Sequence, residues 1–141
     1  MSTVSYSYHA GDLFHAGHLH QLEQAKRLTG ATYLVVGLLT DEAIAAYKPG
    51  RPIVPFELRR RVYEALEIVD LVVRQDNVDP TEVLKIIRPD FLSHGDDWDE
   101  ILGTEWMLEH GGKVVKTPYF EALSTTSIIE RIGLMLKKQW E

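Results

Sequence analysis

Short uninterrupted apolar runs alternate along the chain with longer segments in which apolar residues recur every three or four positions. Residues 32–38 are almost wholly apolar, as in a parallel strand covered on both faces. Residues 17–28 instead place apolar side chains from Leu19 to Leu28 at helical spacing. These patterns predict strands at residues 4–8, 32–38, 71–73, 91–94 and 114–115. They predict helices at about residues 17–28, 41–47, 55–69, 80–87, 99–110 and 124–136.

This regular alternation of strands and helices predicts an α/β fold with a five-stranded parallel sheet and helices on both faces. The 141 residues are enough for one domain, spanning residues 1–141, which could also be excised from a longer chain. Ligands of such sheets bind beyond the carboxyl ends of the strands, where the strand order reverses. We therefore expect the polar loops after the first, fourth and fifth strands to meet at one crevice.

Composition narrows the class of protein. The chain has no cysteine, which excludes disulfides and thiolate chemistry and favours a reducing, cytoplasmic location. We find no signal-peptide pattern and no apolar run near the ~20 residues of a membrane span, so no membrane partner is expected. A net charge of −6 argues against nonspecific nucleic-acid binding, although a local group of donors can still bind a nucleotide.

Candidate chemistry begins in the small-residue loop between the first strand and the first helix. His15 and His18 lie three residues apart where the helix starts, so they can share one helix face. A helix N-terminus presents unpaired N–H groups and partial positive charge, which suits a phosphate, and Gly17 lets a phosphate approach the backbone. This pattern favours phosphate binding over two alternatives, a purely structural histidine pair and a transition-metal site.

The metal alternative would draw on three further side chains, His9, Asp12 and His20. Its weakness is that His20 lies two residues from His18 and therefore faces elsewhere on a helix.

Two other segments carry groups that suit a polyphosphate. Residues 124–127 are four consecutive hydroxyl residues that open the last helix, more than an N-cap requires, and they resemble a phosphate cradle. The loop at residues 48–52 carries Lys48 and Arg51, either as solvated surface charges or as a mobile clamp over phosphates.

The segment after the fourth strand contains Gly95, Asp96, Asp97 and Trp98. The aspartates are either turn-formers or, at a sheet's carboxyl edge, ligands for Mg²⁺, a ribose hydroxyl or a cation. Trp98 either stacks on a base or packs against the sheet. Composition alone does not rank these alternatives.

Three motifs in order resemble the nucleotidyltransferase superfamily that is marked by His-x-Gly-His. Residues 12–18 match the first motif, residues 56–59 resemble the helix motif whose arginine touches the nucleotide, and residues 124–126 match the C-terminal motif. The match covers nearly the whole chain and implies a Rossmann-like fold. Within the superfamily the chain looks like the small cytidylyltransferases.

A narrower resemblance is to the cytidylyltransferase domains of phosphonate biosynthesis, above all in the fosfomycin pathway, where the acceptor is 2-hydroxyethylphosphonate. Residues 94–98 and 51–55 and the Pro118-Tyr119 step carry it. Such domains often sit beside a phosphoenolpyruvate mutase. Heptose-phosphate adenylyltransferases are the runner-up, through residues 111–114 and 124–129, although they usually show Lys-Gly-Gly-Asp in place of residues 94–97.

Two departures from the family pattern affect the substrate. The usual Gly-Thr-Phe-Asp is His9-Ala10-Gly11-Asp12 here, so the threonine hydroxyl is missing. Tyr119 stands where glycerol-3-phosphate cytidylyltransferases carry an arginine, which argues against glycerol 3-phosphate as the acceptor. A nucleotide-binding module without turnover therefore remains an alternative of another class.

The resemblance implies transfer of CMP from CTP to a small phosphonate or phosphate monoester, with release of pyrophosphate, Mg²⁺ as cofactor and a homodimer. The implied catalytic residues are His15, His18 and Lys48. The implied nucleotide-binding residues are Ala10, Gly11, Gly17, Arg59, Gly95, Asp96, Ser124, Thr125 and Thr126. The implied acceptor-binding residues are Asp12, Arg51, Trp98 and Tyr119. A cation such as Lys26 or Arg51 would meet the acceptor's anionic group.

Overall fold

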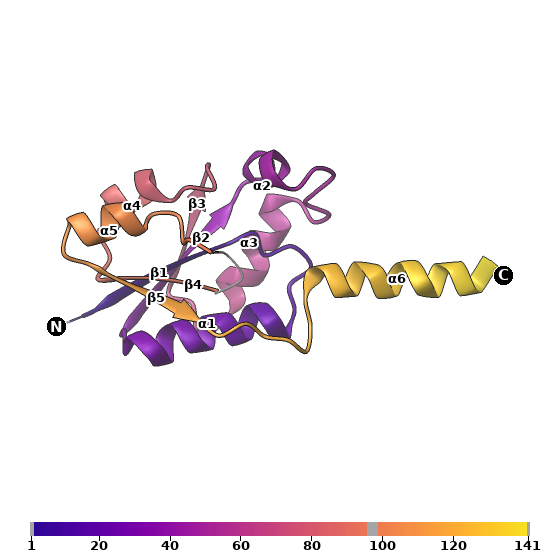
Figure 1. Cartoon of the computed structure of the whole chain (residues 1–141), viewed down its shortest axis with the longest axis horizontal. Coiled ribbons are helices and arrows are strands. Elements are labelled where there is room, and N and C mark those ends of the chain that lie inside the picture. Colours follow the sequence, from indigo (N-terminus) through magenta and orange to yellow (C-terminus); the bar gives the residue numbers. More distant parts are fainter. Residues whose placement is uncertain (1, 96–98, 141) are drawn as a thin grey trace.

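The computed structural model describes residues 2–95 and 99–140 (Figure 1). Its strands are β1 (Val4–His9), β2 (Tyr33–Leu39), β3 (Leu71–Gln75), β4 (Phe91–Gly95) and β5 (Lys113–Thr117). Its helices are α1 (Ala16–Thr29), α2 (Asp41–Tyr47), α3 (Phe56–Ala65), α4 (Thr81–Ile87), α5 (Thr104–Glu109) and α6 (Thr125–Trp140). The predicted order of strands and helices is confirmed.

The sheet is parallel throughout and runs in the order β3-β2-β1-β4-β5. The chain builds outward from β1 to β2 and β3, then crosses back to place β4 on the other side of β1. The strand order therefore reverses between β1 and β4, and their carboxyl ends frame the position at which such folds bind ligands.

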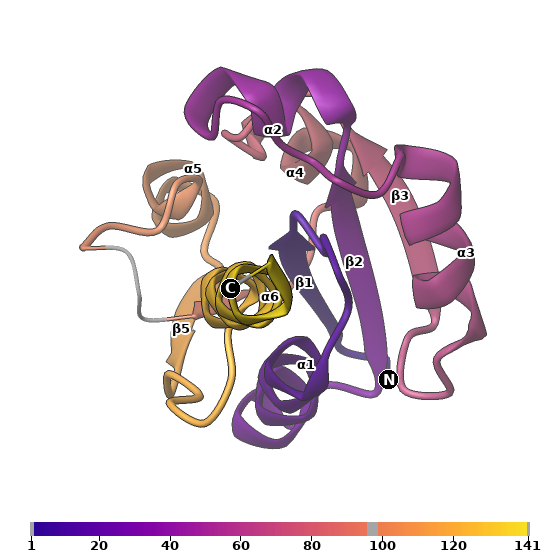
Figure 2. The same ribbon diagram turned by 90° about the vertical axis from the view of Figure 1, so that its right-hand side faces the viewer.

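Helices cover both faces of this sheet, as the alternation predicts (Figure 2). On one face Leu22 of α1 and Tyr63 of α3 are fully buried against β2. On the other face Tyr6 of β1 packs with Leu84 of α4 and Trp106 of α5. Each of these contacts joins residues far apart in sequence, so the two apolar layers hold the loops at the strand ends in place.

Two helices are shorter than their patterns predict. The predicted helix over residues 55–69 ends at Ala65, and residues 66–69 turn into β3 while their apolar side chains pack on the α1–α3 side of the sheet. The helix predicted from residue 99 starts only at Thr104, because Gly103 before it has φ +96° and a Cβ there would lie 2.8 Å from Pro80 Cγ. Tertiary packing, not the local pattern, sets both boundaries.

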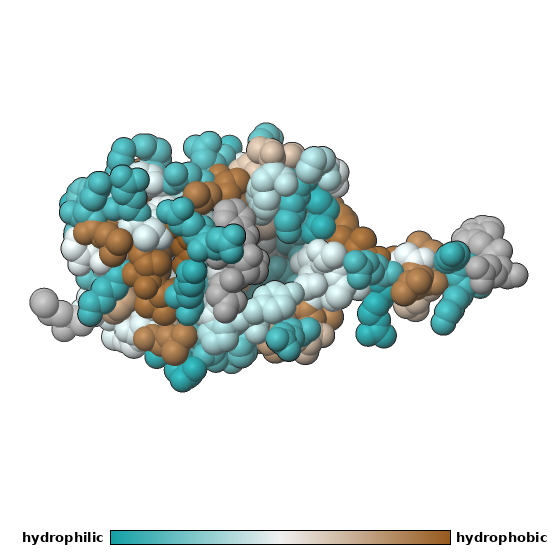
Figure 3. All heavy atoms as spheres, viewed as in Figure 1, coloured by the Kyte–Doolittle hydropathy of each residue, from teal (hydrophilic) through white to brown (hydrophobic). Residues whose placement is uncertain are grey.

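The last helix, α6, leaves the body of the domain and extends away from it (Figure 1). Its residues 130–139 are exposed, including Ile132, Leu134, Met135 and Leu136, and apolar side chains are visible along it in Figure 3. Only its first turn lies at the carboxyl edge of the sheet. Among the described residues, no helix has the length and apolar character needed to cross a membrane.

Candidate active site

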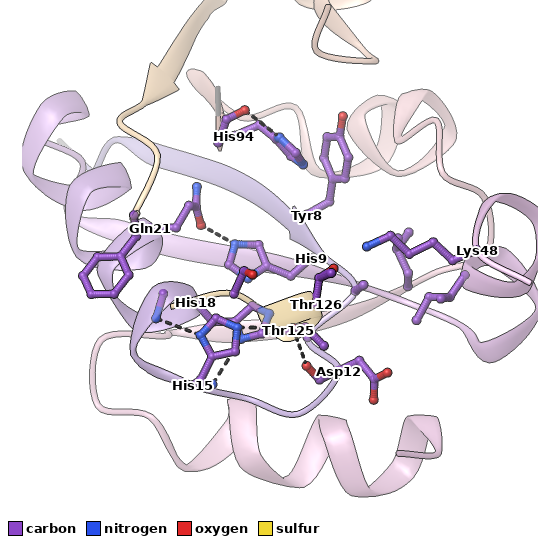
Figure 4. A pocket seen from close by; sticks show the side chains of 18 of the residues that line it. Tyr8, His9, Asp12, His15, His18, Gln21, Lys48, His94, Thr125 and Thr126 are labelled. Atoms are coloured by element: carbon purple, nitrogen blue, oxygen red, sulfur yellow. Dashed lines mark hydrogen bonds between the residues drawn. The ribbon is translucent and has the colours of Figure 1, made fainter. Parts of the chain in front are cut away.

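A cavity of about 660 Å³ opens at the carboxyl ends of β1, β4 and β5 (Figure 4). Its wall consists of Tyr8, His9, Ala10, Gly11, Asp12, His15, Gly17, His18, Gln21, Leu39, Ile44, Tyr47, Lys48, Arg51, His94, Gly95, Pro118, Tyr119, Phe120, Leu123, Ser124, Thr125 and Thr126. The loops after β1 and β5 thus meet at one crevice, as predicted, together with the end of β4; the loop after β4 begins outside the described residues.

Most of the sequence-predicted site residues share this wall. They are Ala10, Gly11, Asp12, His15, Gly17, His18, Lys48, Arg51, Gly95, Tyr119, Ser124, Thr125 and Thr126. Arg59 is not among the lining residues, and Lys26 lies in the last turn of α1, 3.9 Å from Asp70. Asp96 and Trp98 lie outside the described residues.

His15 is the N-cap of α1, and both of its ring nitrogens are engaged. Its Nδ1 accepts from the Gly17 N–H at 2.9 Å, so the neutral ring carries its proton on Nε2. That Nε2 lies 3.2 Å from Thr125 Oγ1, and the Thr125 hydroxyl in turn donates to the Asp12 carbonyl at 3.1 Å. One chain of hydrogen bonds therefore joins the starts of α1 and α6.

His18 completes the same capping arrangement one turn later. Its Nδ1 accepts from the His15 backbone N–H at 3.1 Å, and the two rings lie 4.0 Å apart between centroids. The neutral ring therefore offers its Nε2–H group to the cavity. Burial, followed by the neighbouring His9 and His15 rings, lowers the pKa of His18 to about 3.

His9, His15 and His18 are hydrogen-bond donors, not cations, at neutral pH. Burial lowers the pKa of His15, and burial followed by His94 lowers the pKa of His9 to about 4. Neutral imidazoles can donate to phosphate oxygens without adding charge. Of the wall residues described, Lys48 and Arg51 are the ones that carry fixed positive charge.

Sequence reasoning gave His9 no role except in the metal alternative, yet it sits at the floor of the cavity. The residue is 9% exposed; its ring Nδ1 lies 2.8 Å from the Tyr63 hydroxyl and its Nε2 donates to Gln21 Oε1. Gln21 Nε2 donates to Ser7 Oγ at 3.0 Å. This relay ties α3, β1 and α1 together beneath His18. Its only sequence signal is a polar residue that ends an apolar strand.

Two aromatic side chains of the wall, Tyr8 and Phe120, were also missed. Tyr8 lies 4.4 Å from the His94 ring, and Phe120 lies 5.0 Å from the His20 ring of α1. Tyr8 read as an ordinary strand residue and Phe120 as loop, so neither carried a signal in the sequence. Both side chains line the cavity.

The four hydroxyl side chains at the start of α6 make different contacts. Ser124 and Ser127 cap each other's backbone N–H groups, at 3.0 and 2.9 Å, so these two serve the helix end. Thr125 bonds His15 and the Asp12 carbonyl, and Thr126 lines the cavity. The excess of hydroxyls over an N-cap is therefore real, but two of the four are used in capping.

Two glycines are required by close approach. A Cβ on Gly17 would lie 2.7 Å from His15 Cε1 and 2.9 Å from the Leu123 carbonyl oxygen. Gly11 has φ +67°, and a Cβ there would lie 2.5 Å from Tyr63 Cε2. Gly17 therefore accommodates the loop before α6, and because it also lines the cavity, approach of a phosphate to its backbone stays a prediction.

Asp12 and Arg51 meet inside the cavity wall. The Asp12 side chain is 2% exposed, and it accepts from Arg51 Nε and from the N–H groups of Ile53 and Val54, each at 2.9 Å. Burial alone would raise the pKa of this carboxyl, but those two N–H groups and the guanidinium hold the pKa below its ordinary value. Lys48, on the same loop, lies over the Tyr47 ring at 5.7 Å.

The structure does not bring Arg59 into the cavity, although its motif resembles one whose arginine touches the nucleotide. Its side chain is 1% exposed. It donates to the carbonyls of Val54, Ala10 and Leu39 at 2.6–2.8 Å and to Asp41 at 2.7 Å. Arg59 thereby supports the backbone behind the cavity.

The metal alternative finds no support in the geometry. Among residues 2–95 and 99–140, no group of three His, Cys, Asp or Glu side chains is arranged to hold a metal ion. His20 is not among the wall residues and packs against Phe120, and the Asp12 carboxylate is bonded to three donors of the 51–54 segment.

Comparison with known proteins shows similarity to the bifunctional protein HldE of several bacteria. The chain is 42% identical over 124 residues to the bifunctional protein HldE of Alcanivorax borkumensis, covering 86% of this chain and 26% of that protein. It is 40% identical over 125 residues to the bifunctional protein HldE of Magnetococcus marinus, covering 86% of this chain and 25% of that protein. The chain thus spans about a quarter of the length of these curated relatives.

The fold has a close counterpart among solved structures. The lipopolysaccharide core biosynthesis protein of Thermoplasma volcanium superposes with a TM-score of 0.71 at 22% identity, over 86% of this chain and all of the other. The family model described as cytidylyltransferase-like matches residues 12–131, a span that contains all three sequence motifs. With the His15–His18 pair and the start of α6 joined at the switch point of a Rossmann-like sheet, the chain belongs to the cytidylyltransferase-like family.

Proposed function

We propose that this domain is a nucleotidyltransferase of the heptose-phosphate adenylyltransferase type, which passes AMP from ATP to a sugar phosphate and releases pyrophosphate. One observation carries the proposal: the Nε2–H group of His18, the hydrogen-bonded His15–Thr125 pair and two helix starts converge on one cavity at the switch point of the sheet. Such a donor set suits the phosphates of a nucleoside triphosphate. The identity to the HldE proteins favours adenylyl over cytidylyl transfer.

The reaction requires positioning and charge stabilisation more than acid–base chemistry. An acceptor oxygen attacks the α-phosphorus; a new P–O bond forms as the bond to the β-phosphate oxygen breaks, and pyrophosphate leaves. The Nε2–H group of His18 donates to phosphate oxygens whose charge grows, and that of His15 does so once it exchanges Thr125 Oγ1 for a phosphate oxygen, while Lys48 balances the leaving group. By analogy with other oxyanion donors, loss of one such group costs ~3–4 kcal/mol of barrier.

Mg²⁺ is the expected counter-ion for a triphosphate, but the described wall of the cavity offers it no available carboxylate ligand. In the described part of the wall the one carboxylate is Asp12, which already accepts three hydrogen bonds. We propose that phosphate oxygens hold the ion, with Asp96, outside the described residues, as the side chain to test. When bound, the ion would neutralise charge on the departing pyrophosphate.

A second candidate is transfer of CMP from CTP to a small phosphonate, with 2-hydroxyethylphosphonate as the first acceptor to try. The observation that favours it is His94-Gly95 in the cavity wall, next to Tyr8, where heptose-phosphate enzymes usually show Lys-Gly-Gly-Asp. A homodimer, a cytoplasmic location and fusion to a phosphoenolpyruvate mutase domain stay predictions.

The test is pyrophosphate release with ATP and with CTP, each against heptose 1-phosphate, glycerol 3-phosphate, 2-hydroxyethylphosphonate and 2-aminoethylphosphonate. Turnover with ATP and the sugar phosphate supports the proposal. Turnover with CTP and a phosphonate replaces it by the second candidate. Nucleotide binding by calorimetry without pyrophosphate from any pair would make the domain a binding module.

His18→Ala in the same assay tests the assigned donor. We expect kcat to fall by roughly 10²–10³-fold, because one hydrogen bond to the reacting phosphates is lost. His20→Ala is the matched control, since His20 lies on the same helix but outside the cavity wall, against Phe120. Near-normal turnover of His18→Ala would refute its role as donor.

A further inference from the structure

One loop brings two cations to the cavity, and the protein holds them in different ways. Lys48 and Arg51 both line the wall. Lys48 stands within electrostatic reach of His18, whose pKa its charge helps to lower, after burial and the other nearby residues. Arg51 is instead bonded to Asp12. Arg51 is thus a cation fixed by a carboxylate, whereas no ion pair between the described residues holds Lys48.

The Asp12 carboxylate is filled by contacts within the protein. Its Oδ2 accepts from Arg51 Nε and the Ile53 N–H, and its Oδ1 accepts from the Val54 N–H. With both oxygens bonded and only 2% of the side chain exposed, the group is committed to the 51–54 segment. Asp12 therefore acts on the cavity through that segment and not by touching a ligand.

Arg51 keeps binding capacity after this contact. Its Nε is used by Asp12, but the two terminal nitrogens of the guanidinium are not part of that bond. The side chain is 17% exposed and lines the cavity. A guanidinium fixed at Nε presents a planar fork that matches two oxygens of a phosphate or phosphonate.

We propose that Arg51 binds the anionic group of the acceptor and that Asp12 is the positioning residue that orients it. The inference rests on the proposed function, because nucleotidyl transfer needs a second anionic substrate beside the nucleotide. The acceptor is thereby a small molecule with a phosphate or phosphonate group. Two of its oxygens lie on Arg51 and a third attacks the α-phosphorus, while the P–O bond to pyrophosphate breaks. Lys48 and the histidines serve the nucleotide.

Steady-state kinetics separates this arrangement from a general structural role. In Arg51→Gln and Asp12→Asn we expect the acceptor KM to rise about tenfold or more, the effect of losing a charged hydrogen bond. The nucleotide KM stays within about twofold. Arg51→Lys, which keeps charge without the fork, gives a smaller rise. Arg61→Gln, on the exposed face of α3, is the matched control. An equal rise in both KM values, or an unchanged acceptor KM in Asp12→Asn, overturns the proposal.

A measurement without turnover keeps the two proposals distinct. In ¹⁵N spectra of arginine side chains, the Nε–H signal that disappears in Arg51→Gln is assigned to Arg51. Inorganic phosphate is the ligand added as a probe. We expect that signal to shift with phosphate in the wild type and to lose its protection from exchange in Asp12→Asn. No shift at tens of millimolar phosphate refutes the role of Arg51. A shift without turnover for any substrate pair refutes the proposed function alone.

If Asp12→Asn does not fold, as judged by circular dichroism, the Arg51 variants still test the proposal. Arg51→Gln and Arg51→Lys leave in place the hydrogen bonds that the Ile53 and Val54 N–H groups donate to Asp12, so the segment stays held. A wild-type acceptor KM in both variants would overturn the proposal.

Discussion

Replacing Arg59 by methionine tests whether this arginine supports the fold or serves the nucleotide. The wild-type guanidinium is 1% exposed and bonds four groups. Nε donates to the Val54 carbonyl, Nη1 to the Ala10 and Leu39 carbonyls, and Nη2 to Asp41. Methionine has a similar length and no donor, so the substitution removes these bonds with little change in packing volume.

The expected loss of stability follows from the hydrogen-bond acceptors that the substitution leaves unpaired. Three carbonyl oxygens behind the cavity lose their donor, and each buried unsatisfied group costs about 1–3 kcal/mol. Asp41 is 42% exposed and can be hydrated, so it adds little. Allowing for partial rehydration of the three carbonyl groups, we expect ~4 kcal/mol of destabilisation. For 141 residues this corresponds to a fall in Tm of about 13 °C.

Urea unfolding followed by circular dichroism at pH 7.5 measures the change in unfolding free energy. Arg61→Met on the exposed face of the same helix is the control and should change stability by less than about 0.5 kcal/mol. A loss below about 1 kcal/mol for Arg59→Met would refute the structural role. Normal stability with loss of nucleotide binding would instead support the motif-based hypothesis.

Two further predictions concern the histidines. Thr125→Val removes the hydroxyl between His15 and the loop after β1, so kcat should fall about tenfold. Thr125→Ser keeps a hydroxyl and should retain the wild-type kcat. Equal activity of the two variants would contradict a role for this contact. The unfolding free energy should fall as the pH drops below 6.5, because the pKa values of His9 and His18, about 4 and 3 in the fold, make the unfolded chain bind more protons. His9 alone should lower the unfolding free energy by ~2–3 kcal/mol between pH 7.5 and pH 4.5, measured by urea unfolding at each pH. An unfolding free energy that does not change with pH would refute the burial of His9 as a neutral ring.

Local pattern was sufficient for the layout of the domain. Apolar runs such as residues 32–38 and helical stripes such as residues 17–28 predicted β2 and α1 to within a few residues. The position of the ligand cavity followed from topology, because parallel strands place their carboxyl ends at one edge. Helix ends were less predictable: α3 stops at Ala65, where packing of the next residues outweighs the apolar stripe.

The candidate site was predicted in part. His15, His18, Lys48 and Thr125 all line the cavity, because the motif residues sit at strand ends and helix starts that the topology brings together. Arg59 shows the limit of motif likeness, since the same residue type can face a ligand or a set of carbonyls.

By itself the sequence determined which segments become strands and helices, and which strand ends carry polar groups, since both depend on spacing along the chain. Only the tertiary structure decided how those groups are paired. His9 meets Tyr63, 54 residues away, and Asp12 meets the 51–54 segment, about 40 residues away. Such contacts set which histidine is neutral and which cation is held, because burial and hydrogen bonding act through space.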